Sequence, residues 1–300
     1  MKPAITKGVY FLANDQIYDL TVAFLNSFRK CNPFISLCLI PFNDSILKIS
    51  ALSEKYNFSI WSDASSLEYC DHLSLNFHHN VIGQYRKLVM WTGIFDEFLY
   101  IDTDTIVLQN IDFVFRLLAE FDFLTSYSNL KAIEKWVWKE SVYDNPLLTH
   151  QQIAYAANTG FIASKKGLLP LELVQNKVQE ALQLKYCMEL SCLEQAFLNY
   201  LIVTSGKKHT SLFTLIDSDL YTEKYLECWG GEKIIKIRGE LYKTENHALY
   251  KILFIHWAGL WQKQKIDYQL FRILKGIGLA KEIWQVSLKM PKKGIWKRYR

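Results

Sequence analysis

The sequence predicts an α/β protein with a mostly parallel, covered sheet, and two observations support this prediction. Short apolar runs, such as residues 8–13, alternate along the chain with segments whose apolar residues recur at helical spacing. Strands separated by helices commonly line up in parallel and are covered by those helices. Half of the 300 residues are hydrophobic, which is enough to bury a large core in one large domain or two small ones.

The expected elements follow in order along the chain. Apolar or β-branched runs predict strands at residues 8–13, 34–40, 58–61, 98–101, 121–127, 159–164 and 252–257. Apolar residues at helical spacing, such as Leu20, Phe24 and Phe28, predict helices at residues 16–30, 44–55, 81–94, 111–118, 167–186 and 192–202. Residues 62–80 are expected to be a looser segment. The aromatic stretch 128–157 has little periodicity, and it fits either a docking site for an acceptor or a packed surface helix.

The charge of the chain is unevenly distributed. The net charge is +5, but residues 263–300 carry 11 Lys/Arg against 2 Asp/Glu, which leaves 24 basic and 28 acidic residues in the rest. The basic character therefore belongs to the C-terminal segment, and the main body is not expected to bind nucleic acid. This basic, aromatic segment fits contact with an anionic membrane surface, or alternatively a solvated, frayed end.

The six cysteines form no C-x-x-C pair and no zinc-type spacing, so we expect buried free thiols. The N-terminal residues lead directly into a strand and lack the long apolar segment of a signal peptide. We therefore expect a cytoplasmic protein, with the basic segment offering a way to lie at the inner face of the membrane.

The most informative stretch is an apolar run that ends in Asp102 and Asp104, two carboxylates one residue apart. Residues i and i+2 of a strand point to the same side, so both carboxylates can converge at the carboxyl end of a buried strand, where open α/β sheets bind ligands. Such carboxylates repel each other, and a divalent cation removes that repulsion. The stretch therefore predicts the D-x-D site of a metal-dependent, sugar-nucleotide glycosyltransferase.

Two other interpretations of the same residues stay open. Aspartate is a common turn former, so the pair also fits a polar turn after a strand. The run from Asp102 to Thr105 also resembles the nucleophile motif of HAD-type phosphatases, which would make Asp102 a phosphoaspartyl nucleophile and Asp104 a general acid. Such phosphatases carry this motif near the start of the domain, whereas here three predicted strands with their helices come first.

Four blocks of the sequence resemble glycosyltransferase family 8, which includes glycogenin and the bacterial lipopolysaccharide galactosyltransferases. The blocks follow the family's order, and the first is the most specific. They are residues 85–112, the run Asn158-Thr159-Gly160-Phe161, Glu194-Gln195 with Asn199, and the run Ile255-His256-Trp257-Ala258-Gly259. The resemblance implies a GT-A fold and transfer of a hexose from a UDP-sugar, with retention of configuration.

The resemblance also implies a metal site and a diphosphate contact. Asp102, Asp104 and His256 would bind Mn²⁺ or Mg²⁺, with Thr103 beside them, and the imidazole favours Mn²⁺ because it is a softer ligand. His256 by itself also fits a strand-end histidine of the core. The lysine-proline-tryptophan that usually follows the family's histidine and glycine is missing after Gly259. Lys263 is one position out of register with the missing lysine and is expected to replace it.

Four further residues match positions at which the family holds the donor. Lys87 matches a basic residue before the D-x-D strand, although an ordinary solvated helix cation has the same pattern. Ala13, Asn14 and Asp15 follow the first strand, where the family holds the uridine and ribose. A helix N-cap explains Asn14 or Asp15 equally well.

The last group lies where the family places the donor sugar. Asn158 matches a donor-sugar contact, and Glu194 and Gln195 match an aspartate-glutamine pair near the anomeric carbon. Glu194 also fits the end of a capping box that starts at Ser191. In a transferase of this kind, the leaving phosphate oxygen can take the acceptor's proton on the same face, with Gln195 orienting the groups nearby.

Together these observations predict a GT-A domain at residues 1–262 and a basic extension at residues 263–300. The expected activity is transfer of a hexose from a UDP-sugar to a glycan, a lipid-linked sugar or a protein, as in polysaccharide biosynthesis. The alternatives are a HAD-like phosphohydrolase and a non-catalytic module that binds nucleotide sugars.

Overall fold

The computed structural model describes residues 4–258. The predicted C-terminal extension, together with Gly259 and Lys263, lies outside these residues. The described chain forms two compact units that are interleaved in sequence. Unit 1 contains residues 4–16, 35–102 and 111–222, and unit 2 contains residues 17–34, 103–110 and 223–258. Within the described part, no helix has both the length and the hydrophobicity needed to cross a bilayer.

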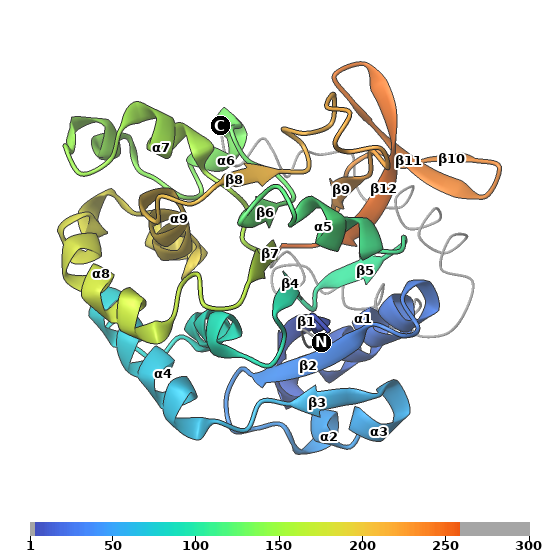
Figure 1. Ribbon diagram of the computed structural model, residues 1–300, viewed down its shortest axis with the longest axis horizontal. Coiled ribbons are helices and arrows are strands. Elements are labelled where there is room, and N and C mark those ends of the chain that lie inside the picture. Colours follow the sequence, from blue (N-terminus) through green and yellow to red (C-terminus); the bar gives the residue numbers. More distant parts are fainter. Residues whose placement is uncertain (1–3, 259–300) are drawn as a thin grey trace. The chain divides into compact units, whose positions relative to one another are not determined.

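Unit 1 contains a seven-stranded sheet flanked by helices (Figure 1). Its strands are β1 (Lys7–Ala13), β2 (Ser36–Pro41), β3 (Phe58–Ile60), β4 (Glu97–Ile101), β6 (Phe123–Thr125), β7 (Phe161–Lys165) and β8 (His209–Ser211). Its α-helices are α2 (Leu47–Ser50), α3 (Ser53–Tyr56), α4 (Ala64–His78), α5 (Asp112–Leu117), α6 (Lys131–Glu134), α7 (His150–Tyr155), α8 (Leu171–Gln183) and α9 (Gln195–Thr204). Its 3-10 helices are η2 (Gly83–Thr92), η3 (Glu140–Asp144), η4 (Lys185–Cys187) and η5 (Leu190–Cys192), and a further one, η1 (Asp15–Ile17), leads into unit 2.

The sheet of unit 1 has the strand order β3-β2-β1-β4-β7-β6-β8. Only β7 runs against its two neighbours, so the sheet is mostly parallel, as predicted. The central strands β1 and β4 have almost wholly buried side chains, which explains their continuous apolar sequences. Helix α8 packs against both α4 and α9 beside this sheet (Figure 1).

Unit 2 is built from α1 (Tyr18–Cys31), the short strand β5 (Thr105–Val107) and a twisted sheet from the end of the described chain. The later strands are β9 (Leu226–Trp229), β10 (Ile235–Ile237), β11 (Glu240–Glu245) and β12 (Ala248–His256). The order is β10-β11-β12-β5, with β9 parallel to β12. Helix α1 packs on β5, where Ser27 Oγ accepts a hydrogen bond from Val107 N at 3.1 Å.

The structure confirms most of the predicted strands and helices and corrects three segments. Residues 62–80 are not loose but contain α4, which the Asp63 carboxylate caps by accepting the Ser65 and Ser66 N–H groups. Residues 81–94 form the 3-10 helix η2, with side chains buried on every side rather than along one stripe. Residues 44–55 form two short helices, α2 and α3. All six cysteines have free thiols, and four of them are buried as expected, whereas Cys31 and Cys192 are partly exposed.

Candidate active site

Three polar segments meet at one edge of the sheet in unit 1. Strands β1 and β4 are parallel, with Tyr10 opposite Tyr100, so Asn14 and Asp102 both follow the carboxyl ends of adjacent central strands. Strand β7 is antiparallel to β4, so residues 158–160 lie at the same edge, and Asp102 N donates to Gly160 O at 2.9 Å. This is the edge at which open α/β sheets bind ligands.

Asp102 and Asp104 occupy the connection between β4 and β5 rather than the end of one strand. The turn follows β4 directly, so the alternation of a strand does not set both side-chain directions as the sequence suggested. Thr103, the residue between them, is buried. The D-x-D motif therefore lies where the chain passes from strand β4 of unit 1 to strand β5 of unit 2.

Asp102 is held by two partners from unit 1. Tyr100 donates its hydroxyl hydrogen to Asp102 Oδ1 at 2.6 Å, and Lys87 Nζ lies 3.5 Å from the same oxygen. The Lys87 ammonium also lies 4.6 Å from the centre of the Tyr100 ring. Asp102 remains 31% exposed at its side chain, so it keeps access to a ligand while these contacts fix its position.

Lys87 pairs more closely with Glu194, and both side chains are buried. Lys87 is 2% exposed and Glu194 is 4% exposed, and Nζ lies 2.5 Å from Oε1. Burial alone would lower the pKa of Lys87, but the Asp102 and Glu194 carboxylates outweigh it and raise that pKa. Burial raises the pKa of Glu194, against the opposing effect of Lys87. Lys87 is thus a buried ion-pair partner and not the solvated helix cation that the sequence left open.

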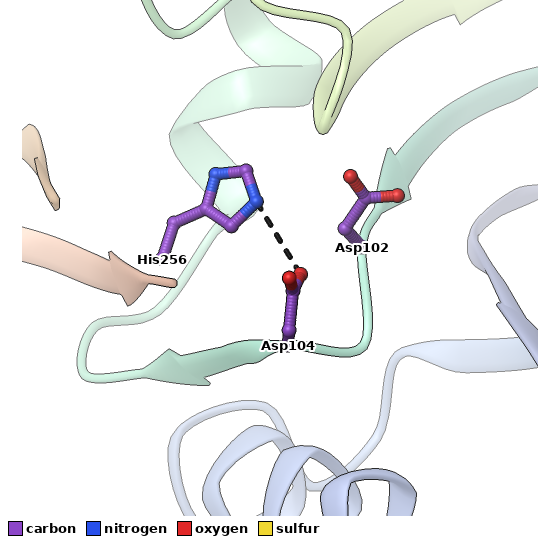
Figure 2. A group of neighbouring side chains, drawn as sticks. All are labelled: Asp102, Asp104 and His256. Carbon is purple, nitrogen blue, oxygen red and sulfur yellow. Dashed lines mark ion pairs between the residues drawn. The ribbon is translucent and has the colours of Figure 1, made fainter. Parts of the chain in front are cut away.

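Asp104 faces a histidine from the last described strand, in unit 2. His256 ends β12 opposite Thr105 of β5, and its Nε2 lies 3.3 Å from Asp104 Oδ1 (Figure 2). On its other side, His256 Nδ1 lies 2.6 Å from Glu227 Oε1. Burial lowers the pKa of His256, but Asp104 and Glu227 outweigh that effect and raise the pKa well above its usual value. The main chain adds a bond from Trp257 N to Asp104 O at 3.0 Å.

Asp102, Asp104 and His256 form a group that fits a divalent cation (Figure 2). Each offers one ligand atom, and these atoms all lie within 4.8 Å of one another. Oxygen ligands suit Mg²⁺ and Mn²⁺, and the added imidazole nitrogen favours Mn²⁺. The chemistry of the donor set therefore matches the metal site that the sequence predicted, in which these side chains would hold the ion and a diphosphate would complete its shell.

The predicted sugar-contact residues lie at the start of α9 and before β7. Gln195 Oε1 accepts from Thr159 N at 3.3 Å, and its Nε2 donates to Trp136 O at 3.0 Å. Asn158 Oδ1 accepts from Gly160 N at 3.1 Å, and Thr159 Oγ1 donates to Glu194 Oε1 at 3.4 Å. These bonds connect the 158–160 segment to the buried Lys87 pair through Glu194.

The capping box predicted at residues 191–194 is not formed. Ser191 bonds instead to Glu189, whose carboxylate accepts both the Ser191 amide and hydroxyl hydrogens. Glu194 precedes α9, but its carboxylate binds Lys87 and does not cap the helix through a side-chain hydrogen bond. The preceding residue, Leu193, has a φ of +59°, a backbone conformation that residues other than glycine seldom adopt. Backbone strain of this kind is common next to functional groups.

Ala13 ends β1, Asn14 and Asp15 follow it, and the three residues have separate environments. Ala13 and Asn14 are buried, and Asn14 Oδ1 accepts from Gln16 N at 3.1 Å. The Asp15 carboxylate accepts from the backbone N–H groups of Lys48 and Ile49, at 3.1 and 3.0 Å. Asp15 therefore holds the first turn of the neighbouring helix α2, not the helix that follows it in sequence.

The sequence analysis missed two residues that contact the predicted ligands. Tyr100 lies two residues before Asp102, and the period of a strand could have placed both on one side. Glu227 lies in residues 203–251, for which no strand was predicted. An isolated glutamate in the otherwise apolar run of β9 was the available signal, because a buried carboxylate needs a partner.

Comparisons with known proteins support the fold. No protein-family model and no curated protein sequence matches the chain. Among solved structures, it is similar to galactosyltransferase LgtC in complex with donor and acceptor sugar analogs, with 14% identity over 96% of this chain and 98% of that chain and a TM-score of 0.53. The LgtC active-site mutant Q189E gives 13% identity and a TM-score of 0.50 over the same shares of the two chains.

A second similar structure is the apo form of the bifunctional glycosyltransferase WbbM. It shares 14% identity and a TM-score of 0.50, over 96% of this chain and 53% of that chain. The chain thus spans about half the length of WbbM and nearly the whole length of LgtC. At these identities the likeness establishes architecture, and the chain has the GT-A glycosyltransferase fold.

Proposed function

We propose that the chain is a metal-dependent glycosyltransferase that moves a hexose from a UDP-sugar to an acceptor, with retention of configuration. One observation carries the proposal: Asp102, Asp104 and His256 present ligand atoms within 4.8 Å of one another in a GT-A fold. The resemblance of residues 85–112 to glycosyltransferase family 8 supports the choice of UDP-sugar and the retaining outcome.

In this proposal, Asp102, Asp104 and His256 hold a cation, with Mn²⁺ preferred over Mg²⁺. When bound, such a cation offsets the charge that develops on the departing diphosphate. Lys87 and Tyr100 fix the position of Asp102, because both contact its Oδ1. Thr103 lies between the two acidic ligands. Ala13, Asn14 and Asp15 are proposed to border the nucleoside, at the sheet edge that Asp102 shares with β1.

The proposed sugar contacts are Asn158, Glu194 and Gln195. They come together because Thr159, which follows Asn158, bonds to both Glu194 and Gln195. Gln195 is held by Trp136 and Thr159, which suits a group that orients a reacting partner without moving. The acceptor is proposed to be a glycan, a lipid-linked sugar or a protein. Gly259, Lys263 and the basic extension, with its proposed membrane contact, lie outside the described residues.

A thermal-shift screen tests the proposal. UDP-, GDP- and dTDP-sugars are each added with and without Mn²⁺, and unfolding of the full chain is followed. A ligand that binds only the folded state adds about 2.7 kcal/mol at a hundredfold excess over its dissociation constant. We expect a UDP-sugar to stabilise the chain when Mn²⁺ is present, and we expect free UDP to be released when an acceptor sugar is supplied.

Asp104→Ala is the matched variant for this screen. It is expected to lose the Mn²⁺-dependent part of the stabilisation while the chain still folds, since Glu227 remains beside His256. Unchanged turnover in Asp104→Ala would count against the site. Donor binding without transfer or hydrolysis would instead identify a non-catalytic binding module, and release of inorganic phosphate would identify a phosphohydrolase.

A further inference from the structure

Glu227 is a buried carboxylate in β9 that faces His256. It is 1% exposed, and its Oε1 lies 2.6 Å from His256 Nδ1. Strand β9 is parallel to β12 and places Glu227 opposite Phe254. Phe254 and His256 are two residues apart and share one face of the sheet, so Glu227 and His256 project from the same face.

The two ring nitrogens of His256 therefore face different groups. Nδ1 faces Glu227, and Nε2 faces Asp104 Oδ1 at 3.3 Å. An ionised carboxylate can only accept a hydrogen bond, so the contact with Glu227 requires the hydrogen to be on Nδ1. When a cation displaces the proton on Nε2, that nitrogen presents its lone pair toward Asp104 while Nδ1 keeps its hydrogen. This is the tautomer that a cation bound by the aspartates needs.

Glu227 is itself fixed by a second buried residue. Lys243 Nζ, from β11, donates to Glu227 O at 3.1 Å and to Glu232 Oε2 at 2.8 Å. Glu232 also accepts from Trp229 N at 2.8 Å, and the Trp229 ring stacks on His256 with 5.4 Å between ring centroids. The strand that carries Glu227 is thus held at Glu227 and at Trp229, which limits where the Glu227 carboxylate can lie.

We infer that Glu227 is a positioning residue of the metal site, which holds the proton on His256 Nδ1 so that Nε2 can bind the cation. This inference rests on the proposed metal-dependent function. Histidines that bind metals commonly donate their other ring hydrogen to a carboxylate, and loss of that carboxylate typically weakens metal affinity about 10–100-fold. The same loss is expected for Glu227.

The direct test is Mn²⁺ binding by the full chain, measured from the paramagnetic resonance signal of free Mn²⁺ in a titration with MnCl₂. Glu227→Met removes the acceptor, and Glu227→Asp keeps the charge but draws the carboxylate back by one methylene. Both are expected to bind Mn²⁺ about 10–100-fold more weakly. The matched controls are Glu245→Met and Glu245→Asp. Glu245 lies in β11 and pairs with Lys243 at 3.3 Å, and its variants are expected to keep wild-type affinity.

A second measurement follows the tautomer itself. In metal-free ¹⁵N-histidine-labelled protein, at a pH high enough for the imidazole to be neutral, the ring nitrogen shifts of His256 are expected to show hydrogen on Nδ1. Glu227→Met is expected to give a mixture of the two tautomers. A role limited to packing would change stability but not this signature. If Glu227→Met does not fold, the same two measurements on Glu227→Asp decide the question.

The outcomes separate this inference from the proposed function. Wild-type affinity in a folded Glu227 variant, or an unchanged tautomer, would overturn the positioning role while leaving the metal site intact. Failure of the wild-type chain to bind Mn²⁺ would overturn the proposed function and the inference with it. A weaker Mn²⁺ affinity in both Glu227 variants, with both Glu245 controls normal, supports the inference.

Discussion

Asp102 and Asp104 are separated by one residue, yet each is held by a different kind of cation. Asp102 lies 3.5 Å from Lys87, which is itself paired with Glu194, all within unit 1. Asp104 lies 3.3 Å from His256, which is paired with Glu227, all within unit 2. In both places the cation bridges one acid of the D-x-D motif and one deeply buried glutamate.

The difference lies in what the two cations can do. A lysine has no lone pair to offer while it is protonated, and the neighbouring carboxylates raise the pKa of Lys87, so it acts as a fixed positive charge. A histidine can exchange its proton for a metal ion. Under the proposed function, the lysine side therefore anchors an acidic ligand, and the histidine side supplies a ligand of its own. Under that proposal, each acid of the D-x-D motif has its own buried glutamate, paired through a different cation.

The largest expected effect comes from removing either acid of the motif. In Asp102→Asn the ammonium of Lys87 keeps Glu194, and in Asp104→Asn the imidazole of His256 keeps Glu227, so both variants are expected to fold. Stabilisation of leaving-group charge by a metal is worth several kcal/mol, so activity is expected to fall on the order of 10³-fold in each variant. Steady-state release of UDP measures the loss. A full loss in one variant and normal turnover in the other would show that the acids do not act on a common ion.

Lys87→Met tests the anchor directly. It removes the cation from Glu194, a side chain only 5% exposed, and breaking a buried pair in this way costs about 3–5 kcal/mol. The loss is read from urea unfolding curves of the wild type and the variant. Replacing both partners, in Lys87→Met with Glu194→Met, is expected to recover much of the stability, because it leaves neither buried charge of the pair. An equal loss in the single and double variants would contradict the ion-pair interpretation.

The sheet of unit 1 and the acidic pair of the candidate metal site were predictable from local patterns. The buried strands β1 and β4 are continuous apolar runs, and Asp102 and Asp104 stand out because they directly follow β4. The predicted segment 16–30 corresponds to α1, since its apolar residues keep helical spacing. Periodicity worked for α1 and for the buried strands, but it missed α4 and did not identify η2 as a 3-10 helix.

The parts that could not be predicted depend on long-range contacts. Lys87 has the local sequence of an ordinary helix cation, and only Glu194, 107 positions later in the chain, reveals that it is buried. Likewise, Glu227 and Lys243 lie on the short strands β9 and β11, and their contacts form when both strands pair with β12. The local sequence also fitted a capping box at Ser191. In the structure, however, Glu194 pairs with Lys87 and Ser191 bonds to Glu189.

Tyr100→Phe is expected to have a smaller effect than the loss of Lys87. It removes one hydroxyl that donates to Asp102 at 2.6 Å and leaves Lys87 in place. A hydrogen bond to a charged group contributes about 1.5–3 kcal/mol to the free energy of unfolding. Because Asp102 is partly exposed, we expect Tyr100→Phe to lose an amount near the lower end of this range. Tyr155→Phe is the control, because Tyr155 bonds to the neutral oxygens of Thr125 and Thr210, each at 3.4 Å. Chemical unfolding should show the larger loss in Tyr100→Phe, and a larger loss in Tyr155→Phe would contradict the charged role of Asp102.

The smallest effect is expected at Asp122, which serves as a solvent-accessible reference for the buried pairs. Its carboxylate lies 3.0 Å from Lys165 Nζ and accepts from Lys208 N at 3.1 Å. Burial alone would raise the pKa of Asp122, but Lys165 and the Lys208 amide outweigh it and lower that pKa. The group therefore stabilises the fold above its unfolded pKa of about 3.9, and this contribution is lost as the pH falls through the lower folded value.

Asp122→Asn is accordingly expected to lower the free energy of unfolding by less than about 1 kcal/mol at neutral pH. The reason is that Asp122 and Lys165 are both partly exposed, so solvent screens their attraction. The difference from the wild type should shrink as the pH falls below about 4, and urea unfolding at several pH values measures it. A loss as large as that of Lys87→Met would mean that exposure does not weaken ion pairs in this chain. Such a result would contradict the distinction between the buried Lys87 pair and this partly exposed pair.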